Sequence, residues 1–314
     1  MANNERKVII NNKNLKRDLI AITSFFNPSN YKNKKQNFIK FRDNLRKQGV
    51  PLLVVECAFG DSDYEIEKED ADIIIRVRSN SKIWQKERLL NIGVNYVPKK
   101  IDKFVFLDCD ILFQNDNWAV ETSKLLEKYP VVQPFEYAYR LAKNQFETKA
   151  PFEFGADEGQ RVNSFAKAVC GLKNLSGLIV GVPGFAWAFN KKTFPKLYDK
   201  MIVGGADAFM AYASFGYHYE AELYSKKMNE DKEKYLENVM NTINGRINYV
   251  SGMILHLWHG DRSNRNHLGR QTILKKHNFD PESDLKLNET GCWEIRKEIG
   301  KEIERYFDSR KEED

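Results

Sequence analysis

Asp108 and Asp110 are separated by a single cysteine and follow directly on the apolar run 103–107. The apolar residues 111–113 come next, so both flanks of the Asp-Cys-Asp segment are expected to be buried. Two carboxylates at such a place are costly unless a cation or hydrogen-bond donors offset their charge. A divalent cation holding a diphosphate does this, because hard cations prefer carboxylate and phosphate oxygens. We interpret the pair as a metal site; the alternative is a solvated turn in which an aspartate caps the next segment.

A second candidate ligand group is the segment 256–260, His-Leu-Trp-His-Gly, at the end of the apolar stretch 249–257. In a strand, alternate residues share a face, so His256 and His259 both point inward only if the chain turns, and Gly260 allows that turn. A neutral imidazole suits a metal site that already has carboxylates. We predict a metal ligand at His256 or His259; the alternative is a histidine hydrogen-bonded in the core or at its rim.

A third feature is Gly204-Gly205-Ala206-Asp207, which opens an expected helix. The two glycines, Gly204 and Gly205, allow another molecule to approach the backbone. Asp207 is then placed to act as a general base that takes a proton from an acceptor hydroxyl. The alternative is that Asp207 only caps the helix N-terminus.

Polar residues also interrupt the amphipathic segment 83–97, namely Lys86, Arg88 and Asn91. They are candidates to contact the base, ribose or phosphate of a nucleotide, and the alternative is a solvated helix face. Glu56 ends the apolar run 52–57. It is a further candidate to accept a hydrogen bond from a bound nucleotide, with a structural role as the alternative.

These residues must be positioned by a regular framework, and the first half of the chain supplies one. Strands are expected at 18–24, 52–57, 72–77 and 103–107, with helices at 31–48 and 83–97 between them. Such alternation predicts an α/β fold with right-handed crossovers and a mainly parallel sheet. Ligand sites in such folds lie at the carboxyl ends of the strands.

The second half is less regular. It predicts strands at 131–133, 178–180, 185–189 and 249–257, helices at 207–215 and 220–243, a loop at 134–160 and a helical tail at 293–314. We expect one domain over residues 1–270, with residues 271–314 forming a C-terminal helical extension packed on it.

The chain has 314 residues, of which 42% are hydrophobic and 30% charged, as in folded globular proteins. Its longest apolar stretch, 177–189, is interrupted by glycine and proline and is shorter than the about 18 residues of a membrane span. Residues 1–10 lack the apolar core of a signal peptide. The four cysteines form no Cys-x-x-Cys pair, which argues against a structural zinc site. We therefore expect a cytoplasmic protein without a transmembrane segment.

The N-terminal residues 1–50 contain twelve lysines and arginines and only three acidic residues. Such a segment can favour a polyanion. The lysines and arginines are interspersed with Phe38, Phe41 and Leu45 at helical spacing, so we interpret them as the solvated face of a helix.

Taken in order, these motifs resemble glycosyltransferases of the GT-A fold, and most closely the inverting family that includes the β-1,4-galactosyltransferases. The resemblance spans residues 18–260. The matching segments are RLLNIG at 88–93, the strand ending in Asp-x-Asp at 103–110, the small-residue strand at 183–189, Gly-Gly-x-Asp at 204–207, and a late histidine at 256 or 259.

The resemblance implies a Rossmann-like GT-A fold, Mn²⁺ or Mg²⁺, and a nucleotide-sugar donor, with a UDP-sugar as the first choice. It implies inverting transfer to a hydroxyl of a glycan or small-molecule acceptor. By the same analogy Asp110 binds the metal directly, Asp108 lies near the ribose or the metal, and Asp207 is the base. Arg262 or Arg265 would add positive charge where the leaving group departs.

The chain also departs from that family. Ala206 replaces a glutamate before the base, and Val203 replaces a bulky aromatic residue before the two glycines. We therefore predict Trp187 as the platform on which an acceptor sugar stacks. The donor-binding start of the family is replaced by residues 23–28, in which we predict Thr23 and Phe25 as donor contacts.

Three other functions remain as alternatives. A viral or phage type of glycosyltransferase that acts on a hydroxymethylated base in DNA would explain the basic N-terminal segment. A nucleotidyltransferase would also use paired aspartates, but residues 20–29 contain no glycine for a phosphate loop. A non-catalytic binding module would not need to keep the acidic, diglycine and histidine motifs together.

Overall fold

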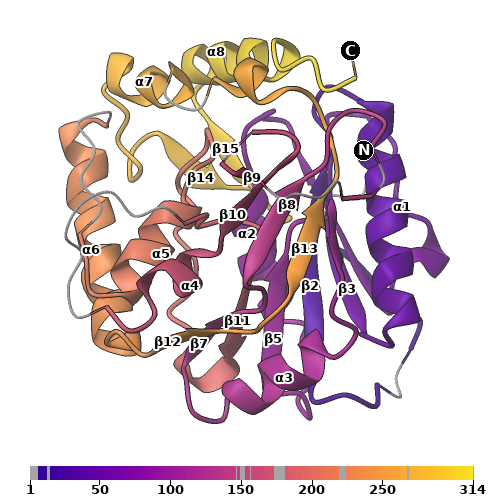
Figure 1. Cartoon of the computed structure of the whole chain (residues 1–314). Coiled ribbons are helices and arrows are strands. Elements are labelled where there is room, and N and C mark those ends of the chain that lie inside the picture. Colours follow the sequence, from indigo (N-terminus) through magenta and orange to yellow (C-terminus); the bar gives the residue numbers. More distant parts are fainter. Residues whose placement is uncertain are drawn as a thin grey trace.

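The computed structural model describes residues 6–12, 15–145, 147–148, 153–155, 157–172, 181–218, 224–266 and 269–313, without the side chains at 262 and 263. A mixed eight-stranded sheet forms its centre (Figure 1). In spatial order its strands are β1 (Lys7–Ile10), β4 (Ile73–Ser79), β3 (Leu52–Phe59), β2 (Leu19–Phe26), β5 (Lys103–Leu107), β11 (Ala186–Asn190), β7 (Val131–Gln133) and β12 (Ile247–Tyr249).

The four strands β4, β3, β2 and β5 are neighbours and run parallel. Every residue of β2 and of β3 is buried. Their sequences are apolar without alternation because both faces of this sheet are covered, which is typical of parallel sheets. The predicted α/β class, with a mixed and mainly parallel sheet flanked by helices, is confirmed.

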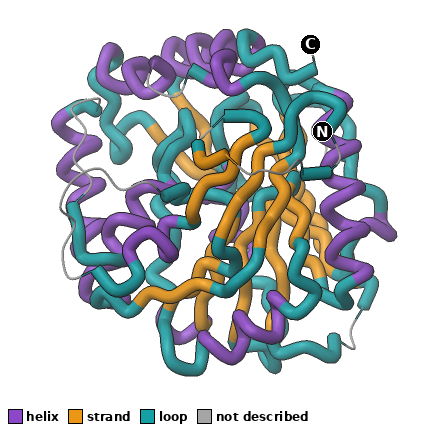
Figure 2. Tube along the Cα trace, viewed as in Figure 1, coloured by secondary structure: helices purple, strands orange, loops and turns teal. Residues whose placement is uncertain are grey.

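Helices cover both faces of the sheet (Figure 2). One face packs on residues of α2, α4, α5, α6, α7 and α8, and the other on α1, α3 and a second, smaller sheet. The helices are α1 (Lys32–Lys47), α2 (Lys86–Val94), α3 (Trp118–Leu125), α4 (Phe165–Val169), α5 (Asp207–Ser214), α6 (Lys226–Ile243), α7 (Gly269–Lys276) and α8 (Lys297–Asp308). Among the described helices, none has the length and apolar character that crossing a bilayer requires.

The second sheet begins directly after the Asp-Cys-Asp segment. In spatial order its strands are β6 (Ile111–Phe113), β13 (Met253–His256), β8 (Tyr137–Arg140), β10 (Gln160–Asn163) and β9 (Glu153–Phe154). Antiparallel pairing of β6 with β13 places His256 opposite Ile111. The two motifs, distant in the sequence, are therefore held side by side by backbone hydrogen bonds.

Two predictions for the second half are wrong. The single strand expected at 249–257 is two strands in different sheets, because the chain turns at Gly252, whose φ of +119° suits glycine. The loop expected at 134–160 contains β8 and β9 instead. The strand expected at 178–180 lies outside the described residues.

The segment after residue 269 packs back on the sheet domain. It consists of α7, the hairpin of β14 (Leu285–Leu287) and β15 (Trp293–Ile295), and α8. The expected helical tail therefore begins with a strand. Gln85 donates a hydrogen bond of 2.7 Å to the Trp293 carbonyl, which fixes β15 beside the start of α2. In Figure 1, β13 points toward the end of the molecule where α7, α8 and the C-terminus lie.

Gly93 lets α2 lie directly against the sheet. A Cβ at this position would be 2.7 Å from Ile22 Cγ2 and 3.1 Å from Val55 Cγ2. We expect Gly93→Val to lower the free energy of unfolding by about 2–3 kcal/mol, because overpacking forces neighbouring groups apart. Urea unfolding would measure this. The exposed substitution Glu237→Ala on α6 should change it by less than about 0.5 kcal/mol, and an equally small effect of Gly93→Val would contradict the close packing.

Candidate active site

The Asp-Cys-Asp segment is fixed by two other segments of the chain. The Asp108 amide donates to the Phe185 carbonyl at 2.8 Å, and the Leu257 amide donates to the Asp110 carbonyl at 2.8 Å. Burial, together with the nearby Asp110 carboxylate, raises the pKa of Cys109 to about 12, so its thiol stays protonated. The two aspartates are thus the reactive groups of this segment.

Asp110, His256 and His259 form a cluster of potential metal ligands whose donor atoms lie within 4.8 Å of one another. The Nε2 atoms of His256 and His259 lie 3.9 Å and 3.3 Å from the Asp110 carboxylate oxygens. β13 ends at His256, so the chain leaves strand geometry before His259 and both rings can reach Asp110. The structure therefore brings both predicted histidines to the same aspartate.

Both rings are poised as neutral ligands. Burial, and then the neighbouring His259 and Arg140, lower the pKa of His256 well below its usual value. Burial and Arg265 lower the pKa of His259, although Asp110 opposes this shift. A neutral imidazole keeps the lone pair that a metal requires.

The geometry fits a divalent ion. Asp110 Oδ1 is buried without a hydrogen-bond partner among the described atoms, a condition that is costly unless something else binds there. One carboxylate and two imidazoles form a donor set suited to a divalent transition-metal ion. On the far side of the ring, His259 Nδ1 lies 3.6 Å from a Glu312 oxygen. A carboxylate in that position orients a metal-binding imidazole.

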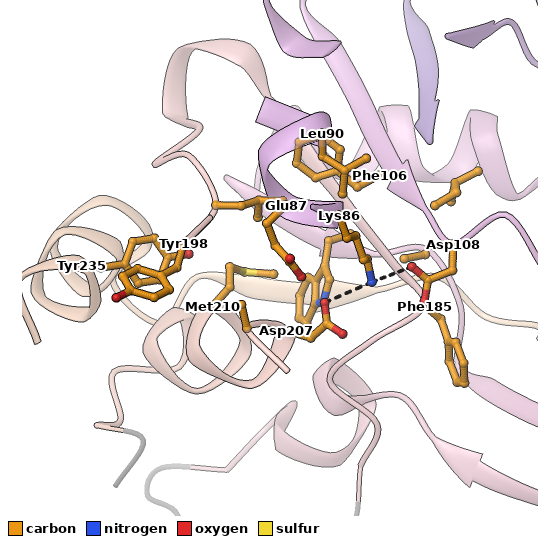
Figure 3. Close-up of a pocket in the computed structure, with 15 residues that line it drawn as sticks. Lys86, Glu87, Leu90, Phe106, Asp108, Phe185, Tyr198, Asp207, Met210 and Tyr235 are labelled. Carbon is orange, nitrogen blue, oxygen red and sulfur yellow. Dashed lines mark hydrogen bonds and ion pairs between the residues drawn. The ribbon is translucent and has the colours of Figure 1, made fainter. Parts of the chain in front are cut away.

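Lys86 connects Asp108 to Asp207. Its ammonium lies 2.6 Å from Asp108 Oδ1 and 3.3 Å from Asp207 Oδ1 (Figure 3). Burial alone would lower the pKa of Lys86, but the two carboxylates outweigh it and hold that pKa well above its usual value. Burial raises the pKa of Asp108 to about 6, against the effect of Lys86. Asp207, at the diglycine helix start, and Asp108, in the Asp-Cys-Asp segment, therefore contact the same lysine ammonium group.

The diglycine turn lies on an indole ring. Gly204 and Gly205 have φ values of +81° and +107°, which favour glycine. A Cβ on Gly204 would be 2.9 Å from the Trp84 ring. The Trp84 indole N–H donates to Glu87 at 3.1 Å. Trp84 thus supports the turn from which Asp207 projects.

All these groups surround one cavity of about 470 Å³. Charged or metal-ligating side chains at its wall are Lys34, Lys86, Asp108, Asp110, Arg140, Asp207, His256, His259, Arg265, Arg270, Arg310 and Glu312. Gly204 is not among the described lining residues, whereas Gly205 is. The cavity thus joins acidic groups that suit a cation with basic groups that suit phosphate.

Several of these lining residues were not predicted from the sequence. Trp84, Arg270, Arg310 and Glu312 all line the cavity, and the last three come from the C-terminal segment. Asn33 of α1 hydrogen-bonds the Glu312 carbonyl. No local motif marks these residues, because only the packing of distant segments places them at the cavity.

The predicted donor contacts on β2 lie away from the cavity. Thr23 is buried and its hydroxyl donates to the Leu107 carbonyl at 2.7 Å. Phe25 is buried against Phe38 of α1. Ser24 and Phe26 are the β2 residues at the cavity wall. Side chains along a strand point alternately to the two faces of the sheet. A prediction that is wrong by one residue therefore selects side chains on the opposite face.

Arg88 and Asn91 hold α2 to neighbouring segments and do not line the cavity. Arg88 lies 3.2 Å from Asp199 and donates to the Gly291 carbonyl at 2.6 Å. Asn91 donates to the Leu197 carbonyl at 2.9 Å. Of the three polar residues singled out on this helix, Lys86 is the one at the cavity wall.

Trp187 and Glu56 do not line this cavity, although Trp187 lines a small neighbouring pocket together with Lys86, Asp108 and Asp207. Trp187 is 5% exposed and its indole N–H donates to the Pro183 carbonyl at 2.7 Å. Glu56 is buried, accepts from the Ile66 amide at 2.9 Å and lies 3.4 Å from the Arg76 guanidinium. The side chain of Arg262 lies outside the described part of the chain, whereas Arg265 lines the cavity.

The basic face of α1 is partly neutralised. Lys35 and Arg42 both pair with Asp70, which is buried. Arg46 hydrogen-bonds the Glu69 carbonyl. These contacts support the interpretation of the N-terminal lysines and arginines as a helix surface.

Comparisons with known proteins were made for the whole chain. No protein-family model and no curated protein matches it. It is similar in structure to S. aureus TarS 1–349 in complex with UDP-GlcNAc, at 10% identity and a TM-score of 0.34, over 76% of this chain and 58% of that chain. It is also similar to a mutant Drosophila β1,4-galactosyltransferase 7 in complex with manganese, UDP-Gal and xylobiose, at 11% identity and a TM-score of 0.35, over 90% and 96% of the two chains.

A third similar structure is 4-diphosphocytidyl-2C-methyl-D-erythritol synthase from Anaerococcus prevotii, at 12% identity and a TM-score of 0.32, over 74% of this chain and 88% of that chain. The chain spans just over half the length of the TarS fragment.

Glu56 offers a test of its structural role. Burial raises its pKa from 4.5 to about 7, so the folded state keeps the proton that the unfolded state releases. Its contribution to stability is fully present below pH 4.5 and is lost as the pH rises through about 7, a loss of roughly 3 kcal/mol. Glu56→Gln should remove this pH dependence in urea unfolding. The exposed control Glu237→Gln should retain it, and an unchanged profile in Glu56→Gln would contradict this assignment.

Proposed function

We propose that this chain is a metal-dependent glycosyltransferase of the GT-A type. It moves a sugar from a nucleotide-diphosphate donor to an acceptor hydroxyl, with inversion at the sugar carbon. The observation that carries the proposal is the meeting of Asp110, Asp207, His256 and His259 around a single cavity of about 470 Å³. These side chains come from three segments that are far apart in the sequence.

The residues divide the work by their positions. Asp110, His256 and His259 would hold a divalent ion such as Mn²⁺, which as a Lewis acid would neutralise the diphosphate of the departing nucleotide. Asp207 projects from the start of α5 and is the candidate base. Lys86 contacts Asp207 and Asp108, and so fixes the direction in which the base points.

The transfer balances as a single displacement. The bond between the sugar carbon and the diphosphate oxygen breaks, and its electron pair leaves with the nucleotide. The acceptor oxygen forms the new bond to that carbon from the opposite side. The proton of the acceptor hydroxyl passes to the Asp207 carboxylate. Gly184 leaves room for this carboxylate, because a Cβ there would lie 3.1 Å from Asp207 Oδ2.

The alternatives receive less support from the residues. A DNA-modifying enzyme would need basic and aromatic side chains in a strip along the surface, whereas Lys35 and Arg42 of α1 are paired with Asp70. A nucleotidyltransferase would not need a base such as Asp207 at the diglycine turn. Glycosyl transfer uses all three motif segments.

A panel of nucleotide sugars, beginning with UDP-sugars, tests the proposal. With Mn²⁺ present, we expect at least one donor to raise the melting temperature, because binding to the native state stabilises it by mass action. Asp110→Asn should abolish this shift, since it removes a carboxylate oxygen from the metal cluster.

The exposed substitution Asp61→Asn is the matched control and should keep the shift. A shift of equal size without Mn²⁺, or in Asp110→Asn, would show that the metal assignment is wrong. No shift with any donor would contradict the proposed function.

Asp207→Asn separates binding from chemistry. The amide cannot accept the acceptor proton, so we expect the transfer rate at saturating donor to fall by about 10²-fold or more. Donor affinity, measured by calorimetry, should change little. Asp61→Asn again serves as the control, and a full transfer rate in Asp207→Asn would require another base.

A further inference from the structure

The cavity contains more positive charge than the proposed donor and metal require. Among the residues that the structure describes, six lysines and arginines and four acidic residues line it. A divalent ion and the diphosphate of a nucleotide sugar neutralise each other. The basic residues therefore exceed the acidic ones by two even when donor and metal are bound, which suits a further anionic group.

Arg270 is a shielded basic residue at the cavity wall. It is 7% exposed, and its Nε is buried with no hydrogen-bond partner among the described atoms. Its guanidinium donates to the Tyr306 hydroxyl at 3.1 Å and lies 5.7 Å from the centre of the Trp84 ring. Within the described ranges, no carboxylate pairs with it.

Three other shielded arginines, Arg76, Arg88 and Arg310, are paired with acids. Arg310, at the same cavity, forms an ion pair with Glu312. Arg76 and Arg88 lie 3.4 Å and 3.2 Å from Glu56 and Asp199. A buried cation without an opposite charge is costly. We therefore expect a bound ligand to supply the negative charge that pairs with Arg270.

Its position assigns that ligand to the acceptor side. A Cβ on Gly205 would lie 3.6 Å from Arg270 Nη2. Gly205 is two residues before Asp207, the candidate base. The metal cluster, by contrast, is built from the end of β13, the segment that follows it and the Asp-Cys-Asp segment. An anion bound at Arg270 would lie beside the diglycine turn.

We propose that Arg270 recognises an oxyanionic group, a phosphate or a carboxylate, on the acceptor substrate. This inference rests on the proposed function. The planar guanidinium suits such groups because it can donate two parallel hydrogen bonds. Trp84 limits the movement of the side chain from one side.

Calorimetry on protein saturated with UDP and Mg²⁺ tests this, with inorganic phosphate and acetate as separate probes. We expect at least one probe to bind the wild-type protein. Arg270→Gln should weaken that binding by at least about tenfold, which corresponds to about 1.4 kcal/mol. Arg305→Gln, on an exposed part of α8, is the matched control and should bind normally. Arg270→Lys keeps the positive charge but lacks the planar guanidinium. Its affinity for the probe should lie between those of the wild type and Arg270→Gln.

The same titrations contain the outcomes that would overturn the inference. UDP affinity should be equal in wild type and Arg270→Gln; an equal loss of UDP and probe affinity would assign Arg270 to the donor diphosphate instead. Binding of neither probe to the wild type would also overturn it. If Arg270→Gln does not fold, the affinities of Arg270→Lys for UDP and for the probe are compared with those of the wild type instead. Failure of UDP to bind with Mg²⁺ excludes a UDP-sugar as the donor, whereas titration of phosphate without UDP still tests the anion site.

Discussion

The ion-pair cluster at Lys86 is the interaction on which the site depends. Asp108 and Asp207 lie within 3.3 Å of one ammonium group, and Glu87 is buried nearby with a pKa raised to about 8 by burial and by Asp207. Without Lys86, carboxylates from the end of β5 and the start of α5 would repel each other in a poorly solvated place. Lys86 therefore makes it possible to bring the metal-binding segment and the candidate base to the same cavity. The rest of the fold can be understood as the support of this arrangement: α2 packs on the sheet through Gly93 and thereby fixes where Lys86 projects.

Much of the framework could be predicted because its strands are buried on both faces. β2, β3 and β5 appear in the sequence as continuous apolar runs, which few other structures produce. The prediction failed where backbone conformation, and not hydrophobicity, decides the structure. At Gly252 an apolar run divides between two sheets. Between β7 and α4 the strands are short, and they join the smaller sheet through β8, which pairs with β13, a strand whose position no local pattern reveals.

The candidate site was predictable to the extent that its chemistry is local. Asp108, Asp110, Asp207 and the two histidines follow strands or open a helix, and the structure brings them together. To predict that Ser24 and Phe26 line the cavity, and Thr23 and Phe25 do not, one must know which face of β2 is turned toward it. Both faces of this strand are buried, so its sequence shows no alternation of polar and apolar residues that would reveal this. Trp84, Arg270 and Glu312 depend on how the segment after residue 269 folds back, which is a matter of long-range packing.

That returning segment affects the order in which the site is completed. Arg310 and Glu312 form part of the cavity wall, and a Cβ on Gly260 would lie 2.8 Å from Glu312 Cα. A nascent chain that has left the ribosome only as far as α7 already contains every strand of the two larger sheets, but it lacks the carboxylate that faces His259. The histidine turn thus acquires its final surroundings only after the strands of the central sheet have been synthesised, and that sheet can form before the candidate metal ligands are fully enclosed.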